Sequence, residues 1–186
     1  LFYYILEEHT KMNDKVFCTF PYPYMNGSLH VGHGACMLPC DIMCKFGKLT
    51  GKNTFFPFGF HGTGTPIVSS AYKLKNELEN GIENGQKEML IKAGVSEDEI
   101  DKFIEPEYWV EYFSNEGLTV LEEFGISIDA SFRTTNNPYY SSFIKWQFSK
   151  LMDKGYLVKG TKPVIFDHQT NQICLDHDRK TGEGIK

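Results

Sequence analysis

The chain has 186 residues, of which 41% are hydrophobic and 23% are charged, a composition typical of a globular domain and not of a disordered chain. Its 24 acidic and 19 basic residues give a net charge of −5, which excludes an overall basic surface for nucleic acid but not a local basic patch. No apolar run approaches the length of about 18 residues that a transmembrane helix needs, so no membrane partner is expected. Because the chain does not begin with Met, we expect it to be part of a longer protein.

The pattern of apolar, glycine and proline residues predicts strand, loop and helix twice over, followed by further helices and then by short strands. In chain order, the expected elements are a strand at 15–20, a helix at 29–49, a strand at 54–58, helices at 67–79, 86–93, 108–124 and about 138–155, and short strands at 157–159, 164–167 and 173–175. Ser28 is the expected N-cap of the first long helix, and Ser96 with Glu99 predicts a capping box that opens a short helix.

Strand, loop and helix in this order indicate an α/β fold with a parallel sheet. Parallel sheets bind ligands at the carboxyl ends of their strands. The loops at those ends, residues 21–27 and 59–66, are rich in Gly and Pro and are the most unusual stretches of the sequence. We therefore expect the functional site there.

Five cysteines indicate a reducing, cytoplasmic setting without a disulfide framework, because their number is odd and no C-x-x-C pair occurs. Cys36, Cys40 and Cys44 recur every four residues and would form one stripe on a helix. The stripe is either a set of small buried hydrophobic residues or a thiol cluster for a metal, and the sequence favours the first interpretation.

Two histidines stand at the start of the first long helix. His30 and His33 lie three residues apart, so both fall on one face of the first turn. The positive end of a helix attracts phosphate, imidazole adds hydrogen-bond donors, and Gly32 would let a base or a ribose approach the backbone. The pattern predicts a nucleotide with its phosphates between the two rings. On spacing alone, a pair of surface histidines or half of a metal site remain open alternatives.

Residues 20–34, which read FPYPYMNGSLHVGHG, resemble the HIGH signature of the class I aminoacyl-tRNA synthetases. The wider match, together with FPFGFHGTGTPI at 56–67, is similar to the leucyl enzymes. Two later blocks, at 137–148 and 176–184, also fit, and the second is similar to the cytosolic eukaryotic enzymes. The chain therefore resembles the N-terminal catalytic fragment of a eukaryotic-type leucyl-tRNA synthetase.

The resemblance implies a domain organisation. Residues 1–156 would form the first half of a Rossmann-like parallel-sheet domain, and residues 157–186 a β-hairpin linker towards the editing insertion of the family. The second signature of the class, Lys-Met-Ser-Lys-Ser, does not occur in the sequence, so only part of an active site is expected here. Cys174, His168 and His177 offer three ligands near the hairpin, but the expectation is no structural zinc and no metal site.

The resemblance also implies an activity. A leucine–tRNA ligase in the cytoplasm activates leucine with ATP and Mg²⁺ to leucyl-adenylate and transfers the leucyl group to tRNA(Leu). The chain would associate with the rest of the synthetase or with a multi-synthetase assembly. A truncated nucleotide- or partner-binding module without catalytic activity is the alternative.

The resemblance assigns roles to individual residues. His30 and His33 would be catalytic and would bind ATP, together with Gly32, Asn26 and Gly27. The residues implied to bind leucine are Phe20, Tyr22 and His61. His61 falls where bacterial relatives usually carry an Asp that holds the substrate ammonium, and the resemblance implies either that it accepts from this ammonium through one ring nitrogen or that it only lines the site.

Overall fold

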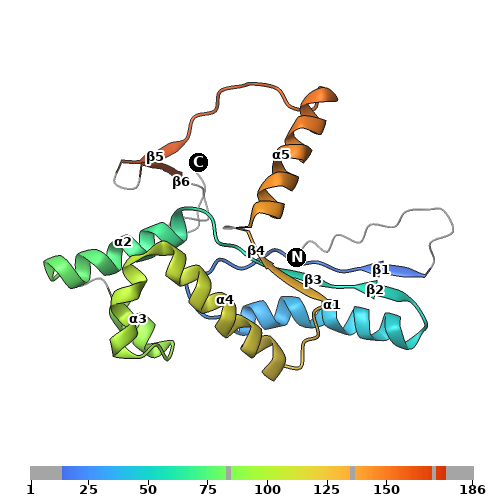
Figure 1. The fold of residues 1–186 in the computed structure, drawn as a ribbon, viewed down its shortest axis with the longest axis horizontal. Helices are drawn as coiled ribbons and strands as arrows, with labels where there is room; N and C mark the ends of the chain where they lie inside the picture. The colour runs from blue at the N-terminus through green and yellow to red at the C-terminus, as the bar shows by residue number, and fades with distance from the viewer. Residues whose placement is uncertain (1–13, 83–84, 135–136, 169–170, 175–186) are drawn as a thin grey trace. The chain divides into compact units, whose positions relative to one another are not determined.

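The computed structural model describes residues 14–82, 85–134, 137–168 and 171–174, and its elements confirm the α/β fold. In chain order they are β1 Lys15–Phe17, α1 Val31–Leu49, β2 Asn53–Phe55, β3 Pro57–Phe60, α2 Thr65–Asn80, α3 Gln86–Lys92, the 3₁₀ helix η1 Glu97–Ile104, α4 Pro106–Glu123, β4 Ala130–Arg133, α5 Pro138–Asp153, β5 Ile165–Asp167 and β6 Gln172–Cys174 (Figure 1). The chain divides into two units, residues 1–61 with 107–133 and residues 62–106 with 134–186, and each is described by itself.

The first unit contains two parallel strand pairs. β1 pairs with β2, and β3 pairs with β4 so that Gly59 stands opposite Phe132. β2 and β3 follow each other along the chain, separated by Phe56, whose N–H donates to Asp129 Oδ2 at 2.7 Å and whose carbonyl accepts from the N–H of Asp129 at 2.9 Å. Parallel strands need a crossover connection, and α1 supplies it between β1 and β2, running alongside both (Figure 1).

The inner face of α1 is built from small and apolar side chains. Met37, Cys40 and Cys44 are buried, and Cys36 is half-buried. Burial raises the pKa of Cys18, which follows β1, to about 12, and burial also raises the pKa of Cys40 and of Cys44. These thiols stay protonated at neutral pH, which supports the interpretation of the cysteine stripe as a packing surface.

The C-terminal half of α1 is bonded to the segment that joins α4 to β4. Three side chains make these bonds: Asp41 Oδ1 accepts from the N–H of Ser127 at 2.9 Å, Lys45 Nζ donates to the carbonyl of Gly125 at 2.7 Å, and Lys48 Nζ donates to Asp129 Oδ1 at 3.2 Å. The backbone N–H of Phe56 and, secondarily, Lys48 hold the pKa of Asp129 below its ordinary value. The helix and the strand β4 are thereby tied into one unit.

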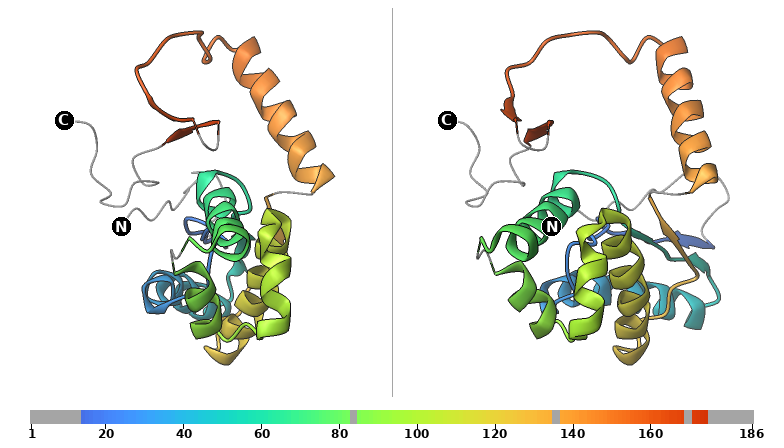
Figure 2. Two further views of the ribbon diagram at one scale, coloured as in Figure 1. Left: turned by 90° about the vertical axis from the view of Figure 1, so that its left-hand side faces the viewer. Right: turned by 60° about the vertical axis from the view of Figure 1, so that its left-hand side comes forward.

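In the second unit, α2, α3 and η1 pack together around a small apolar core, and Figure 2 shows these green helices gathered in one cluster. The buried residues of the cluster are Ile67, Ala71, Leu74, Leu90, Ile100 and Phe103. The predicted capping box at Ser96 is wrong. The Ser96 hydroxyl donates to Glu99 Oε2 at 3.4 Å and bonds no backbone group, and the segment it opens is a 3₁₀ helix.

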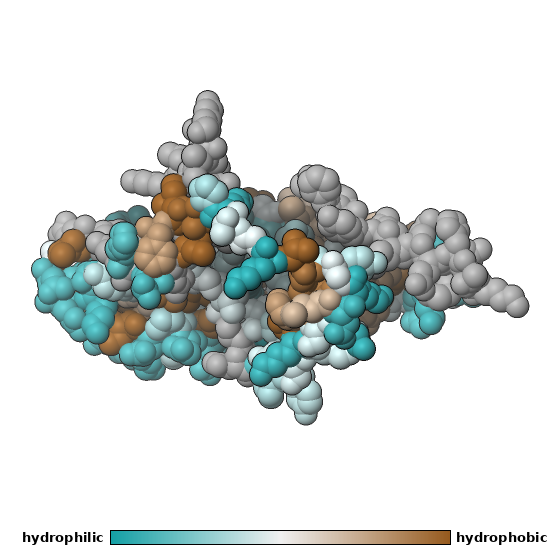
Figure 3. Space-filling model, turned by 90° about the horizontal axis from the view of Figure 1, so that it is seen from above, coloured by the Kyte–Doolittle hydropathy of each residue, from teal (hydrophilic) through white to brown (hydrophobic). Residues whose placement is uncertain are grey.

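Helix α5 begins where the sequence predicts, and its side chains differ in burial from those of the other long helices. Asn137 Oδ1 accepts from the N–H groups of Tyr139 and Tyr140, at 3.1 Å each. None of the side chains of α5 is buried, and Trp146, an aromatic residue of the kind that usually packs in a core, is 56% exposed. Figure 3 shows apolar side chains (brown) between hydrophilic ones (teal) on one face of the surface.

The predicted C-terminal hairpin is confirmed, since β5 and β6 are antiparallel with Phe166 opposite Ile173. The predicted strand at 157–159 is wrong, because the structure has no strand there. Nothing in the structure tests the predicted division at residue 156, which stays a prediction. Of the helices in the described residues, none combines the length and apolar character needed to cross a lipid bilayer.

Candidate active site

The first turn of α1 is capped by two imidazoles. His30 is the N-cap residue, with an extended backbone, and its Nδ1 accepts from the N–H of Gly32 at 3.1 Å. In return, Nδ1 of His33 accepts from the N–H of His30 at 3.2 Å, which completes a reciprocal capping box. The predicted cap at Ser28 is therefore wrong by two residues. The side chain of Ser28 hydrogen-bonds instead to Glu116 of α4.

The capping bonds determine which ring nitrogen carries the hydrogen. A neutral imidazole accepts through one nitrogen and donates through the other, so rings that accept at Nδ1 carry N–H at Nε2. The two rings stack, with centroids 3.9 Å apart and an interplanar angle of 24°. Burial, with a smaller contribution from His30, lowers the pKa of His33 below 6.5 and favours its neutral form. The helix start therefore presents two stacked Nε2–H donors.

Gly32 makes room for the ring of its neighbour. A Cβ at Gly32 would lie 2.9 Å from Cε1 and 3.0 Å from Nδ1 of His30, closer than side chains tolerate. The predicted role, access for a base or a ribose, stays a prediction, since the space beside Gly32 holds the His30 ring. Gly27 differs, because a Cβ there would meet no described atom within 4 Å. Asn26 lies half-buried beside it in the same loop.

The two predicted loops meet at the carboxyl end of β3. The N–H of His61 donates to the carbonyl of Pro23 at 2.8 Å, and the N–H of Met25 donates to the carbonyl of His61 at 3.1 Å. These bonds form a parallel β-bridge between Tyr24 and His61, and the centroids of the two rings lie 4.3 Å apart. The structure thus brings His61 to the loop that leads to His30, at the strand ends where the sequence places the site.

Two of the predicted leucine-binding residues lie on opposite faces of β3. Phe20 is 9% exposed and stacks on Phe58, with centroids 5.4 Å apart. Tyr22 is half-buried and lies against Gly59, the next residue of β3. Successive residues of a strand point to opposite faces, so the two aromatic rings are separated by the strand. Of the two, Tyr22 retains more surface from which to contact a ligand.

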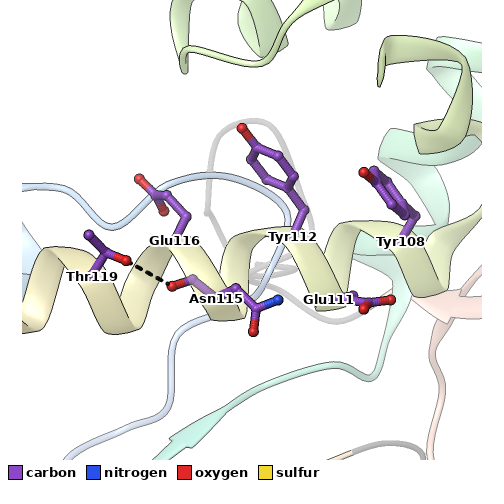
Figure 4. Close-up of a pocket in the computed structure, with 6 residues that line it drawn as sticks. All are labelled: Tyr108, Glu111, Tyr112, Asn115, Glu116 and Thr119. Carbon is purple, nitrogen blue, oxygen red and sulfur yellow. Dashed lines mark hydrogen bonds between the residues drawn. The ribbon is translucent and has the colours of Figure 1, made fainter. Parts of the chain in front are cut away.

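A pocket of about 310 Å³ opens along one face of α4, a feature that the sequence analysis did not find (Figure 4). Its lining consists of Tyr108, Glu111, Tyr112, Asn115, Glu116 and Thr119. Arg133 of β4 donates to Asn115 Oδ1 at 2.8 Å, and burial raises the pKa of Glu116. The sequence signal was the recurrence of polar residues every three or four positions along α4. Through Ser28 and Glu116, this pocket adjoins the loop that carries the histidines.

Comparison with known proteins identifies relatives of this chain. The family of tRNA synthetases class I (I, L, M and V) matches residues 1–178. A leucine–tRNA ligase of Aeropyrum pernix is 42% identical over 168 residues, covering 89% of this chain and 17% of that protein. The cytoplasmic leucine–tRNA ligase of Pongo abelii is 36% identical over 224 residues, covering 97% of this chain and 19% of that protein.

A solved structure has the same fold. In the ternary complex LeuRS-tRNA-LeuAMS of Agrobacterium radiobacter K84 agnB2, one chain aligns with a TM-score of 0.59 at 15% identity, covering 92% of this chain and 19% of that one. This chain thus spans about a fifth of the length of the relatives it matches. With parallel strand pairs, a histidine-capped first helix and a family match over residues 1–178, the chain belongs to the class I tRNA synthetases.

Proposed function

We propose that the full-length gene product is a leucine–tRNA ligase of the cytoplasm, and that this chain supplies the end of its active site that holds the ATP phosphates. The observation that carries the proposal is the reciprocal imidazole cap at the start of α1, formed by His30 and His33. The leucine–tRNA ligases among the relatives support leucine and tRNA(Leu) as the other substrates.

The first step needs alignment more than proton transfer. The leucine carboxylate attacks the α-phosphorus of ATP, and pyrophosphate leaves. A carboxylate is already ionised at neutral pH, so neither histidine has to act as a base. The protein has to hold the two reactants in line and to place donors where negative charge grows. The Nε2–H groups of His30 and His33, at the positive end of the α1 dipole, are suited to that task.

The residues near His30 and His33 are each assigned to one of the two substrates, ATP or leucine. In the proposal, Asn26, Gly27 and Gly32 adjoin the nucleotide, since they lie in the loop and the first turn around His30. Tyr22 and His61 contact leucine. In the proposal, a ring nitrogen of His61 accepts from the substrate ammonium. Phe20 shapes the same pocket from behind, through its stacking on Phe58.

Mg²⁺ enters the proposal only as the counter-ion that accompanies the triphosphate. Among the described residues, no group of three His, Cys, Asp or Glu side chains is arranged to hold a metal ion. No step is therefore assigned to a protein-bound metal. Membership of the class I tRNA synthetases supports the use of ATP itself.

Leucine-dependent exchange of pyrophosphate into ATP by the full-length gene product tests this role. We expect His30→Ala and His33→Ala to lower the exchange rate by about 10²-fold or more, which is the usual cost of losing a donor to transition-state charge. The dissociation constant of leucine should change by less than about threefold, because the lost interaction belongs to the phosphates.

A matched control is Glu88→Gln, which removes an exposed ion pair with Lys92 in the second unit and should leave the exchange rate unchanged. Full exchange by both histidine variants would contradict the assigned role. Binding of ATP by the wild-type protein without any leucine-dependent exchange would instead favour the alternative function, a nucleotide-binding module without catalytic activity.

A further inference from the structure

Gly59 of β3 and Tyr22 lie closer together than any residue but glycine allows at position 59. A Cβ at Gly59 would lie 2.6 Å from Cδ2, 2.7 Å from Cε2 and 2.8 Å from Cγ of Tyr22, and real Cβ atoms essentially never approach other atoms within 3.0 Å. The three atoms form one edge of the ring. A side chain at position 59 would therefore have to push the whole ring away from the strand.

The backbone gives no other reason for glycine at this position. Gly59 lies within a strand, and it is absent from the glycines of the described residues that have positive φ. Glycine weakens a strand, and a glycine inside one commonly marks the close approach of another group. Here the approaching group is the ring of Tyr22.

A second contact fixes the ring from the side. Phe132 stands opposite Gly59 in the pairing of β3 with β4, and its ring meets that of Tyr22 edge-on, with centroids 5.3 Å apart and an interplanar angle of 88°. Gly59 is buried, whereas Tyr22 keeps part of its surface exposed. The ring therefore rests on the backbone of β3 and against Phe132, and a ring displaced by a new side chain would move away from β3.

We propose that Gly59 is a positioning residue that sets how closely the Tyr22 ring approaches β3 and, through this distance, the size of the amino-acid pocket. This inference rests on the proposed function, in which Tyr22 contacts leucine. A methyl group at position 59 displaces the ring into the space that the leucine side chain occupies. The enzyme should then lose affinity for leucine more than for the smaller valine, while ATP, on the other side of the reacting carboxylate, is little affected.

The variant Gly59→Ala in the full-length gene product tests the proposal by pyrophosphate exchange. We expect the KM for leucine to rise by about tenfold or more, which is the scale of one methylene in an apolar pocket. The preference for leucine over valine should fall, and the KM for ATP should change by less than about threefold. Gly160→Ala is the matched control, because a Cβ there meets no described atom within 4 Å.

The same substitution in a Tyr22→Ala background separates positioning from general damage. With the ring absent, Gly59→Ala has nothing to displace and should change the KM for leucine by less than about twofold. Equal losses in both backgrounds, or equal rises in the KM for leucine and for ATP, would overturn the proposal.

Unfolding midpoints provide a measurement that does not depend on activity. Gly59→Ala should lower the midpoint when Tyr22 is present and should leave it nearly unchanged in the Tyr22→Ala background. Should Gly59→Ala alone fail to fold, recovery of folding in the double variant supports the contact and failure of both contradicts it. Absence of leucine-dependent exchange in the wild type refutes the proposed function, whereas additive midpoint shifts refute the positioning role.

Discussion

Helices α1 and α5 begin with different caps. At α5, the amide oxygen of Asn137 accepts from the N–H groups of Tyr139 and Tyr140, an arrangement common at helix starts. At α1, the rings of His30 and His33 take that role. The Asn137 amide that caps through Oδ1 keeps its donors on the adjacent Nδ2, whereas an imidazole that caps through Nδ1 keeps its donor on Nε2, at the far side of the ring. The comparison teaches that one side chain can stabilise a helix end and still offer a donor to a ligand.

The largest expected effect comes from a variant that separates the roles of the two ring nitrogens of His33. In His33→Asn, the amide oxygen lies near the former Nδ1 and keeps the cap, but no donor remains near Nε2. We expect exchange of pyrophosphate into ATP to fall by about 10²-fold while the unfolding free energy changes by less than about 0.5 kcal/mol.

The complementary variant is His33→Gln, whose longer amide reaches towards the former Nε2 and which is a common residue at this position of a capping box. It should lose less activity than His33→Asn, and its unfolding free energy should likewise change by less than about 0.5 kcal/mol. If both variants lost unfolding free energy in proportion to their loss of exchange activity, the capping role and the donor role of His33 would not be separate.

The next largest effect concerns the cap of α5. Asn137→Ala should lower the unfolding free energy by about 1 kcal/mol, because it leaves the N–H groups of Tyr139 and Tyr140 without their acceptor. Asn137→Asp, which keeps an acceptor oxygen, should restore most of the loss. Urea denaturation of the full-length gene product measures both variants.

Ser96 provides the contrasting case for that experiment. Its hydroxyl bonds the carboxylate of Glu99 and no backbone group, so Ser96→Ala should change the unfolding free energy by less than about 0.5 kcal/mol. A loss at Ser96 as large as that at Asn137 would show that side-chain capping does not explain the difference.

The smallest effect is a pH dependence at α1. The folded state lowers the pKa of His33, so as the pH falls below 6.5 the unfolded chain takes up a proton before the folded one does. The stabilisation by the cap is thus complete above about pH 6.5 and declines as the pH falls towards the lowered pKa. Unfolding midpoints between pH 8 and 5 should show a smaller decline in His33→Asn, which caps without titrating. An identical decline in the wild type and in His33→Asn would show that His33 is not the source of the pH dependence.

Local signals predicted the start of α5 but not the cap of α1. The Asn-Pro pair at the start of α5 acts on its immediate neighbours, and the structure confirms it. Ser28 carries an equally good local signal, but its hydroxyl is engaged by Glu116, which is far away in the sequence. A contact of this kind cannot be seen from the residues around Ser28. The role of the two histidines as caps likewise escaped prediction, although their place at the helix start was correct.

The strands also show that local sequence signals miss contacts between residues far apart in the chain. β4 was not predicted, because the four residues Ala130–Arg133 are too short and too mixed to stand out, and only pairing with β3 makes them a strand. Alternation along a strand would have placed Phe20 and Tyr22 on one face. Pro21 and Pro23 interrupt that alternation, and the rings end on opposite faces of β3. The meeting of the two loops was predictable, since it follows from parallel strand order alone.

The cysteines beside the candidate active site have a chemical consequence. A thiol reacts with alkylating reagents and peroxides as its thiolate, and Cys18, with a pKa of about 12, holds almost none of that form at neutral pH. Cys40 and Cys44 are shielded in the same way. A maleimide added to the folded protein should therefore modify the half-buried Cys36 before these three, so most of the cysteines that pack around α1 are protected from modification while the protein is folded.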